Sequence, residues 1–447
     1  MQLPILFLDS IKDAKGFVRE EFDAIHNSFE RITSIRINPT KFINSNSPFP
    51  ITQNIPWTQF GYYLPSRPSF TFDPLFHSGS YYVQEASSMF LEQVFLQLVD
   101  VSKPLKVLDL CAAPGGKSTH ILSLISKNSL LVCNEVIRSR VNSLNENIVK
   151  WGYDNVVVTN NDAKDFQHLE NYFDVIVVDA PCSGSGLFRR DEAAIEEWSL
   201  NNVNLCSGRQ QRIVADILPS LKENGILIYS TCSYSREEDE EICKWVEREF
   251  QMKHEELKIN DEWGIVSSDY GYRFWPHRLQ GEGFFLACFR KTERESNSKF
   301  KSIANKQKSI KIKSEQFHKW IKYKDFEFLE YQKNNYAVNK ELFCDIDFLL
   351  SKLRVINFGV NVGVVIRDKY IPSHELAMSD ILIKDVPFIE LDYNQSIQFL
   401  KKKELQNSTT GIGFQLAKYK NQNLGWLNVL SNRINNYYPK ELRIRKD

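Results

Sequence analysis

The stretch that decides the fold is Lys-Val-Leu-Asp-Leu-Cys-Ala-Ala-Pro-Gly-Gly-Lys-Ser-Thr-His, residues 106–120. It begins as a short apolar run and passes through Gly115 and Gly116 into a segment with a helical pattern. Two adjacent glycines allow a sharp bend and let the backbone lie close to a ligand. The stretch therefore predicts a strand, a tight turn and a helix whose first amide groups favour a negatively charged group.

Apolar runs of the same kind alternate with helical segments from about residue 76 to residue 291. The runs are residues 106–110, 129–133, 155–158, 173–178, 225–229 and 283–288. Because they are apolar on both faces, they fit strands that are buried between two layers of helices. Regular alternation of strand and helix predicts an α/β fold with a doubly wound parallel sheet. In such sheets ligands bind beyond the carboxyl ends of the strands.

The chain has 447 residues, which is too long for a single core and predicts several domains. We expect a small α+β subdomain at residues 1–75 and the α/β domain at residues 76–292. A basic linker is expected at 293–324 and a β-rich region at 325–447. Lysines greatly outnumber acidic residues within 299–324. This run fits a solvated linker, and it would also favour binding of a nucleic acid.

Composition and charge limit the class of protein. The formal net charge is zero, so the overall charge does not indicate a polyanionic partner, although a basic face can still exist. The eight cysteines show no CxxC pair and no disulfide-like spacing, which favours reduced thiols, a cytoplasmic location and no zinc site. The N-terminus lacks the features of a secretory signal, and no apolar run is long enough to span a membrane. Nothing in the sequence requires a dimer, so we expect a monomer.

The pattern around the glycine turn points to a particular nucleotide cofactor. A phosphate-binding P-loop is excluded because Cys111 stands where its first glycine would be, and GxGxxG is absent. Glu135 ends the next apolar run, where a carboxylate can accept hydrogen bonds from both hydroxyls of a ribose. Asp162, after the third run, could reach an adenine amino group. These contacts without a pyrophosphate loop suit S-adenosylmethionine, and a glycine turn in a nucleotide-free sheet is the alternative.

Two cysteines directly follow predicted strands. Cys182 lies in DAPCSGSG, residues 179–186, and Cys232 lies in STCSYS, residues 230–235. Both are expected at the ligand-binding edge of the sheet, and spacing does not decide which of them would act as a nucleophile. The remaining six cysteines fit small buried side chains, with a backbone role added for the first: Cys111, Cys133, Cys206, Cys243, Cys288 and Cys344.

Three blocks in one order resemble a known family. CAAPGGK (111–117), DAPCSGSG (179–186) and STCS (230–233) resemble the signature blocks of the Sun (Fmu)-type RNA cytosine-C5 methyltransferases. QEASSMF (84–90) and GEGFFLA (281–287) resemble blocks that flank them. The resemblance covers about residues 30–290. It implies a Rossmann-like class I methyltransferase sheet.

The end of the chain more weakly resembles the tail of the bacterial RsmF-like branch, which acts on ribosomal RNA. The stretches concerned are residues 364–378 and 424–443. In that branch a PUA-like module helps to bind RNA. The resemblance therefore implies RNA-binding roles for the C-terminal region and for the N-terminal subdomain, with the RNA target base single-stranded or flipped from its stack.

The implied chemistry requires a thiolate. Carbon 5 of cytosine is a poor nucleophile until a thiolate adds at carbon 6 and makes the ring enamine-like, which is covalent catalysis. The resemblance assigns the attack to Cys232 and assistance in product release to Cys182. Asp179 would bind the amine or N3 edge of cytosine and line the cofactor site. DNA cytosine-C5 methyltransferases attack from a Pro-Cys block, so the reversed assignment of the two thiols is an alternative.

The resemblance also implies S-adenosylmethionine as the cofactor and ribosomal RNA, with the small subunit favoured, as the substrate. Ten residues would bind the cofactor: Cys111, Ala112, Ala113, Pro114, Gly115, Gly116, Lys117, Glu135, Asp162 and Asp179. Lys117 fits either a cap at the helix start or a contact with the cofactor carboxylate. The alternative function is a non-catalytic RNA-binding or ribosome-assembly factor that keeps an inherited cofactor pocket.

Overall fold

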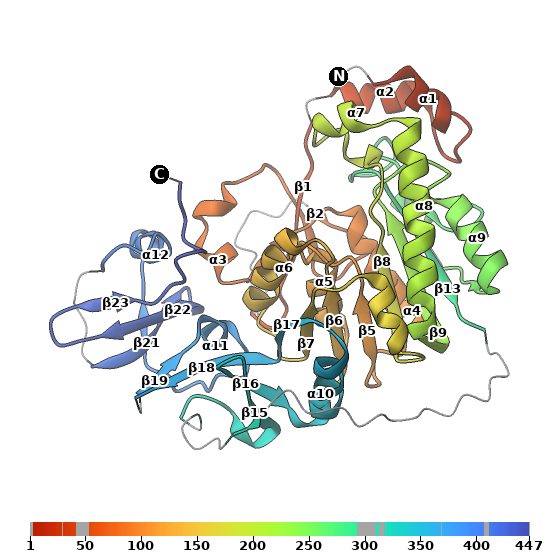
Figure 1. The fold of residues 1–447 in the computed structure, drawn as a ribbon. Helices are drawn as coiled ribbons and strands as arrows, with labels where there is room; N and C mark the ends of the chain where they lie inside the picture. The colour runs from red at the N-terminus through yellow and green to blue at the C-terminus, as the bar shows by residue number, and fades with distance from the viewer. Residues whose placement is uncertain are drawn as a thin grey trace.

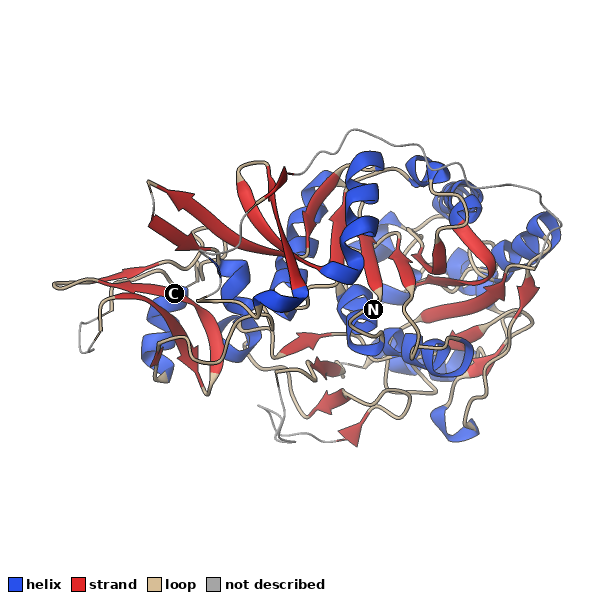
Figure 2. Ribbon diagram, turned by 90° about the horizontal axis from the view of Figure 1, so that it is seen from below, coloured by secondary structure: helices blue, strands red, loops and turns tan. Residues whose placement is uncertain are grey.

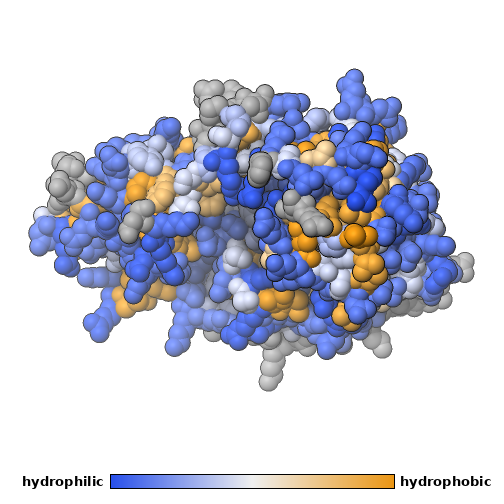
Figure 3. All heavy atoms as spheres, turned by 90° about the horizontal axis from the view of Figure 1, so that it is seen from above, coloured by the Kyte–Doolittle hydropathy of each residue, from blue (hydrophilic) through white to orange (hydrophobic). Residues whose placement is uncertain are grey.

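The protein is described by a computed structural model that covers residues 3–28, 30–41, 53–292, 310–312, 317, 319–367, 369–405 and 411–446. A large central sheet carries helices on both faces, with a helical N-terminal segment at one end and two further sheets at the other (Figure 1). Among the described residues, no helix has the length and hydropathy needed to cross a membrane. The face drawn in Figure 3 is mostly hydrophilic, with scattered hydrophobic patches.

The central sheet has ten strands in the order β11-β12-β13-β9-β8-β5-β6-β7-β17, with β10 paired to β13. The five from β7 to β9 run parallel, and β13 is antiparallel to β9. All six predicted runs are strands of this sheet, so the predicted α/β fold is confirmed. The strands are β5 Lys106–Asp109, β6 Leu130–Asn134, β7 Val156–Thr159, β8 Phe173–Asp179, β9 Leu221–Thr231, β10 Lys253–His254, β11 Val266–Ser267, β12 Tyr272–Phe274, β13 Phe284–Arg290 and β17 Val355–Phe358.

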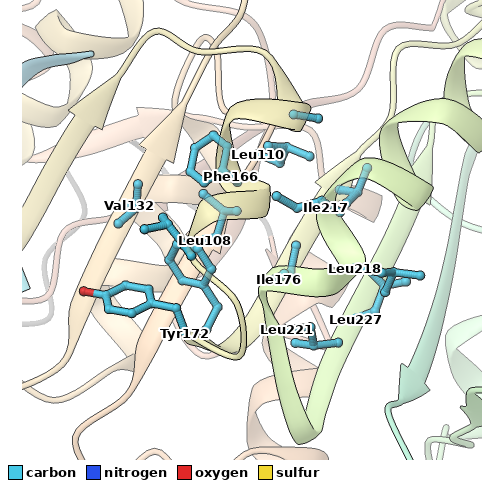
Figure 4. Packing of buried hydrophobic residues seen from close by; sticks show 14 of the residues in the cluster. Leu108, Leu110, Val132, Phe166, Tyr172, Ile176, Ile217, Leu218, Leu221 and Leu227 are labelled. Atoms are coloured by element: carbon cyan, nitrogen blue, oxygen red, sulfur yellow. The ribbon is translucent and has the colours of Figure 1, made fainter. Parts of the chain in front are cut away.

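Helices bury both faces of this sheet. One face packs against α4 (Leu91–Leu98), α5 (Gly116–Leu124) and α6 (Arg138–Trp151). The other packs against α8 (Leu200–Ile217), α9 (Glu240–Phe250) and α10 (Phe343–Lys352), and Figure 4 shows part of this second core. Burial of side chains from both faces of every central strand explains why the strands have continuous apolar sequences.

The N-terminal part forms a separate four-stranded sheet in the order β2-β3-β1-β4. Its last strand lies beyond residue 75, where the sequence placed the end of the subdomain, because β4 pairs with β1. Helix α1 packs on the central domain through Phe7, which contacts Phe188 and Trp198 edge to face. The elements are α1 Ile5–Ile11, α2 Arg19–Asn27, β1 Thr33–Ile37, β2 Gln53–Asn54, β3 Gly61–Leu64, α3 Pro74–His77 and β4 Tyr81–Val83. Helix α7 of the central domain, Ala193–Glu197, packs against the same hydrophobic cluster as α1.

The C-terminal region contains a five-stranded sheet, β14-β15-β16-β18-β19, and a four-stranded sheet, β20-β21-β22-β23, which form a strand-rich lobe (Figure 2). The predicted β-rich character is confirmed. Most of the predicted linker lies outside the described residues, but residues 310–311 form β14. The elements are β14 Ile310–Lys311, β15 Phe326–Tyr331, β16 Asn334–Asn339, β18 Val360–Ile366, β19 Lys369–Pro372, α11 His374–Met378, β20 Phe388–Glu390, α12 Tyr393–Leu400, β21 Gly413–Tyr419, β22 Gln422–Val429 and β23 Ile434–Asn436.

One strand of this C-terminal region belongs to the central sheet. Strand β17 pairs antiparallel with β7, and Phe358 of β17 packs into the same core as α8 and α9. The C-terminal region is therefore joined to the central domain by a shared sheet and a shared core.

Candidate active site

The two cysteines that follow predicted strands meet in space. Strands β8 and β9 are parallel neighbours with Asp179 opposite Ser230, so the loops that follow them lie side by side. The Sγ atoms of Cys182 and Cys232 are 3.1 Å apart, and both side chains are partly exposed. The hydrogen bond to Cys232 and burial together raise the pKa of the Cys182 thiol well above its usual value. Cys182 is therefore held in its protonated form beside Cys232.

Two cavities open at this edge of the sheet, and five residues line both of them. The larger has a volume of about 500 Å³ and the smaller about 360 Å³. Both are lined by Cys111, Ala113, Asp179, Leu187 and Cys232. Two molecules bound in adjoining cavities would meet at Asp179 and Cys232, which is an arrangement suited to transfer of a group between them.

The larger cavity is lined by three of the predicted cofactor-binding acids, Glu135, Asp162 and Asp179. Glu135 is buried, and its Oε1 accepts a hydrogen bond from the Ile137 amide at 2.8 Å. Its Oε2 accepts no hydrogen bond from the described residues, although Arg140 lies 3.6 Å away. Asp162 lines the same cavity and caps a short helix through the Lys164 amide at 3.3 Å. A buried carboxylate oxygen without a donor fits a ligand that brings hydroxyl groups, such as a ribose.

The glycine loop divides between the two cavities. Gly115 has a left-handed φ of 110°, which favours glycine, and it caps the start of α5. Within the loop of residues 111–117, Cys111 and Ala113 line both cavities. Four others line the smaller cavity only: Ala112, Pro114, Gly116 and Lys117. Gly115 lines neither cavity, so its part in the loop is to permit the turn.

Lys117 lies at the smaller cavity and forms an ion pair there. Its Nζ is 2.8 Å from Asp179 Oδ2, and Ser230 donates to Asp179 Oδ1 at 2.8 Å. Burial opposes the charge on Lys117, but Asp179 raises the pKa of its ammonium group above the usual value. The structure therefore places Lys117 in the first turn of α5, beside Asp179 and the smaller cavity.

A further acid lies beneath the loop. Asp109 is fully buried and accepts a hydrogen bond from Ser118 at 2.6 Å. Burial raises its pKa to about 7, and nearby Asp179 and Glu135 act in the same direction. Asp109 also lines the smaller cavity, and its hydrogen bond with Ser118 connects the end of β5 to the first turn of α5.

The sequence missed a buried acid beneath the two thiols. Glu238 is fully buried and accepts hydrogen bonds from Ser183 and Ser233, which directly follow Cys182 and Cys232. It lies in the acidic run at 237–241, a pattern typical of an exposed helix start, so the sequence carried no signal of its burial. Of the other six cysteines, four are buried as expected, whereas Cys111 is partly exposed because it lines both cavities. Cys344 is exposed, and the expectation of a buried side chain is wrong there because it lies on the outer face of α10.

Relatives of this chain share almost its entire length. It is 30% identical over 438 residues to ribosomal RNA small subunit methyltransferase F of Psychromonas ingrahamii, covering 92% of this chain and 90% of that protein. The chain belongs to the RsmF family. A relative of the same name from Aeromonas salmonicida is 29% identical over 435 residues, with the same coverage of both chains. This family consists of S-adenosylmethionine-dependent RNA methyltransferases, so the protein is an enzyme.

Family models match three consecutive parts of this RsmF-family chain. The N-terminal domain of 16S rRNA methyltransferase RsmF matches residues 3–86, and 16S rRNA methyltransferase RsmB/F matches residues 96–290. The PUA domain of methyltransferase RsmF matches residues 386–444, which form the four-stranded C-terminal sheet. The predicted resemblance to this family is confirmed.

Solved structures share the fold. A methyltransferase homologue from Pyrococcus horikoshii is 28% identical, with a TM-score of 0.54 over 64% of this chain and 94% of that chain. The NSun6 structure with SFG from the same organism is 21% identical, with a TM-score of 0.53 over 65% of this chain and 99% of that chain. No group of three or more His, Cys, Asp or Glu side chains within the described residues could hold a metal ion.

Proposed function

We propose that this RsmF-family enzyme transfers a methyl group to carbon 5 of a cytosine in small-subunit ribosomal RNA, through a covalent bond between Cys232 and carbon 6 of the ring. One observation carries the proposal most directly. Cys232 and Asp179 line both adjoining cavities, and Cys182 lies 3.1 Å from Cys232. A base in the smaller cavity would thus lie between a nucleophile, a hydrogen-bonding carboxylate and the cofactor cavity.

The cofactor would occupy the larger cavity. Bound S-adenosylmethionine supplies an electrophilic methyl group on a sulfonium. Glu135 would accept hydrogen bonds from the ribose hydroxyls, because its Oε2 is buried and accepts no hydrogen bond from the described residues. Asp162 would face the adenine, and Cys111 and Ala113 would form the wall on the side of the loop. The remaining loop residues would hold this wall in place.

The proposed reaction consists of addition of Cys232 to the RNA base, methyl transfer and elimination of Cys232. The Cys232 thiolate forms a bond to carbon 6, and the electron pair of the carbon 5–carbon 6 double bond becomes available at carbon 5. Carbon 5 takes the methyl group from the sulfonium, which becomes a neutral thioether, and a water molecule then accepts the carbon 5 proton. The bond between sulfur and carbon 6 breaks, which restores the ring double bond and regenerates the Cys232 thiolate.

The neighbours of Cys232 would support these steps. Asp179 would bind the exocyclic amine or N3 edge of cytosine while Lys117 and Ser230 hold its carboxylate in place. Cys182 would assist the release of the product. Its sulfur lies 3.1 Å from that of Cys232, so its thiol can donate a proton to the departing sulfur.

We further propose a division of roles along the chain. The N-terminal subdomain, residues 1–75, and the C-terminal region, residues 325–447, would bind RNA around the methyltransferase domain of residues 76–292. The basic linker of residues 293–324 would add electrostatic attraction. The enzyme would act as a monomer in the cytoplasm, where ribosomal RNA is assembled in bacteria.

Transfer of a labelled methyl group tests this function. The purified enzyme is incubated with methyl-labelled S-adenosylmethionine and small-subunit ribosomal RNA, and the nucleosides are then separated. The proposal predicts label in 5-methylcytosine. Bisulfite sequencing of the same RNA should locate the 5-methylcytosine at a single position. Label in another nucleoside would contradict it, and absence of transfer and of cofactor binding would favour the non-catalytic assembly factor.

A further inference from the structure

One buried carboxylate contacts both loops that carry the thiols. Glu238 lies between β9 and α9 and is fully buried. Its Oε1 accepts a hydrogen bond from the backbone amide of Ser183 at 2.8 Å, and its Oε2 accepts from the Ser183 hydroxyl at 2.5 Å. The Ser233 hydroxyl also donates to Oε2, at 2.6 Å. Because Ser183 follows Cys182 and Ser233 follows Cys232, the carboxylate is bonded to the residue after each thiol.

Helix α8 adds a further donor to the same network. Gln210 donates from Nε2 to Glu238 Oε1 at 3.2 Å and to the carbonyl of Pro181, the residue before Cys182, at 3.1 Å. All four bonds to Glu238 come from N–H or O–H donors, which is the arrangement expected around an ionised carboxylate. Burial raises the pKa of Glu238 above its usual value, and the hydrogen bonds from the two serines act in the opposite direction.

We infer that Glu238 is a positioning residue whose carboxylate holds Cys182 and Cys232 close together, so that both thiols can act on the same pyrimidine ring. The inference rests on the function proposed above. Glu238 lines neither cavity, so it acts through the loops and does not touch the substrate. Movement of either loop would break a hydrogen bond to a buried charge, which makes their relative position costly to change.

A neighbouring acid provides a matched control. Glu240 is also buried and belongs to the same segment. It pairs with Arg273 of β12 through two hydrogen bonds and contacts neither residue that follows a thiol. Loss of the Glu240 carboxylate therefore removes a buried charged group from this part of the fold without releasing the serines that follow Cys182 and Cys232.

The separation of the thiols can be measured without enzymatic activity. Diamide oxidises two neighbouring thiols to a disulfide and is itself reduced to the hydrazine, and mass spectrometry follows the peptide that links Cys182 to Cys232. We expect the same rate for the unmodified enzyme and Glu240→Gln, and a rate lower on the order of tenfold for Glu238→Ala, because disulfides require close sulfur atoms. Glu238→Gln should be intermediate, since its amide oxygen can still accept from the Ser183 amide.

Two results of the crosslinking experiment would overturn the inference: an unchanged rate in Glu238→Ala, or an equal loss in Glu240→Gln. If Glu238→Ala does not fold, the Ser183→Ala/Ser233→Ala double variant replaces it. Slower crosslinking is expected for this variant too, and an unchanged rate would contradict the inference.

In the activity assay, Glu238→Ala should lower kcat about 100-fold with an unchanged Kd for S-adenosylmethionine. Equal losses of kcat and cofactor affinity would indicate a purely structural role and contradict the inference. The crosslinking result stays interpretable even if the unmodified enzyme proves not to methylate cytosine, so failure of the proposed function is distinguishable.

Discussion

The Sγ atoms of Cys182 and Cys232 lie 3.1 Å apart, although the two residues are 50 positions apart in the chain. Parallel pairing of β8 with β9 brings their loops together, with Asp179 opposite Ser230. One ring bound beside these thiols can therefore be reached by both sulfur atoms. This relationship underlies the roles proposed for the two cysteines and the first prediction.

Replacement of Cys182 should trap the reaction after methyl transfer. In Cys182→Ser, Cys232 can still add to the ring, but the group proposed to assist release is absent, so a covalent protein–RNA adduct accumulates. A denaturing gel after incubation with RNA and S-adenosylmethionine shows the adduct as a slower band. Cys344→Ser, at an exposed thiol on α10, is the control and should form no stable adduct. Turnover of Cys182→Ser at the normal rate would contradict the release role.

Replacement of Glu135 should weaken cofactor binding. Glu135→Ala removes the carboxylate proposed to accept from the ribose hydroxyls, and hydrogen bonds to a charged group contribute about 1.5–3 kcal/mol. Titration calorimetry should show a Kd for S-adenosylmethionine that is higher by about 10- to 100-fold. Glu146→Ala, on the following helix α6 and outside both cavities, is the control. Equal affinities for Glu135→Ala and the unmodified enzyme would exclude Glu135 from the cofactor site.

The raised pKa of Asp109 predicts a pH-dependent stability. With a pKa of about 7 in the folded protein against 3.8 as the ordinary value, its stabilising contribution is complete below pH 4 and is lost as the pH rises through 7. Asn at this position can still accept from Ser118 and does not ionise. The free energy of unfolding of Asp109→Asn relative to the unmodified protein should therefore rise by about 3 kcal/mol between pH 5 and pH 8.

Urea unfolding of both proteins across this pH range measures the difference. Parallel stability curves for Asp109→Asn and the unmodified protein would show that Asp109 has no raised pKa. The measurement uses the protein without cofactor, so that binding at the neighbouring cavity does not contribute.

The strand that joins the C-terminal region to the central sheet should contribute substantially to stability. Phe358 of β17 is 1% exposed and stacks on Tyr336 with ring centroids 4.3 Å apart. Phe358→Ala should lower the free energy of unfolding by about 3–5 kcal/mol, because it leaves a cavity in a shared core. Ile356→Ala, at an exposed position of the same strand, should cost much less. Similar losses in both variants would contradict the shared core.

The sequence predicted the central sheet well because its strands are buried on both faces, which leaves continuous apolar runs such as residues 173–178. The carboxyl-end rule then located Cys182 and Cys232 at one edge. It could not predict that β17 joins the central sheet, because antiparallel pairing with β7 across about two hundred residues leaves no local pattern.

Two features of the site also lay beyond the sequence. Lys117 pairs with Asp179 only because α5 begins and β8 ends at the same edge of the sheet, a contact set by tertiary packing. Glu238 lies in a run of acids that is typical of a solvated helix start, and its burial depends on the two serines that follow the thiols. Local patterns give residue types and elements, whereas pairing of charged groups depends on the fold.

The central claim is the covalent bond from Cys232 to the target base. The most direct test uses small-subunit ribosomal RNA transcribed with 5-fluorocytidine, whose carbon 5 cannot lose fluorine, so that the adduct is trapped on the unmodified enzyme. After nuclease and protease digestion, mass spectrometry identifies the cysteine that carries the nucleotide. We predict a nucleotide on Cys232 and no adduct in Cys232→Ala. The claim would be contradicted by a nucleotide on Cys182, or by methyl transfer to cytosine that survives in Cys232→Ala.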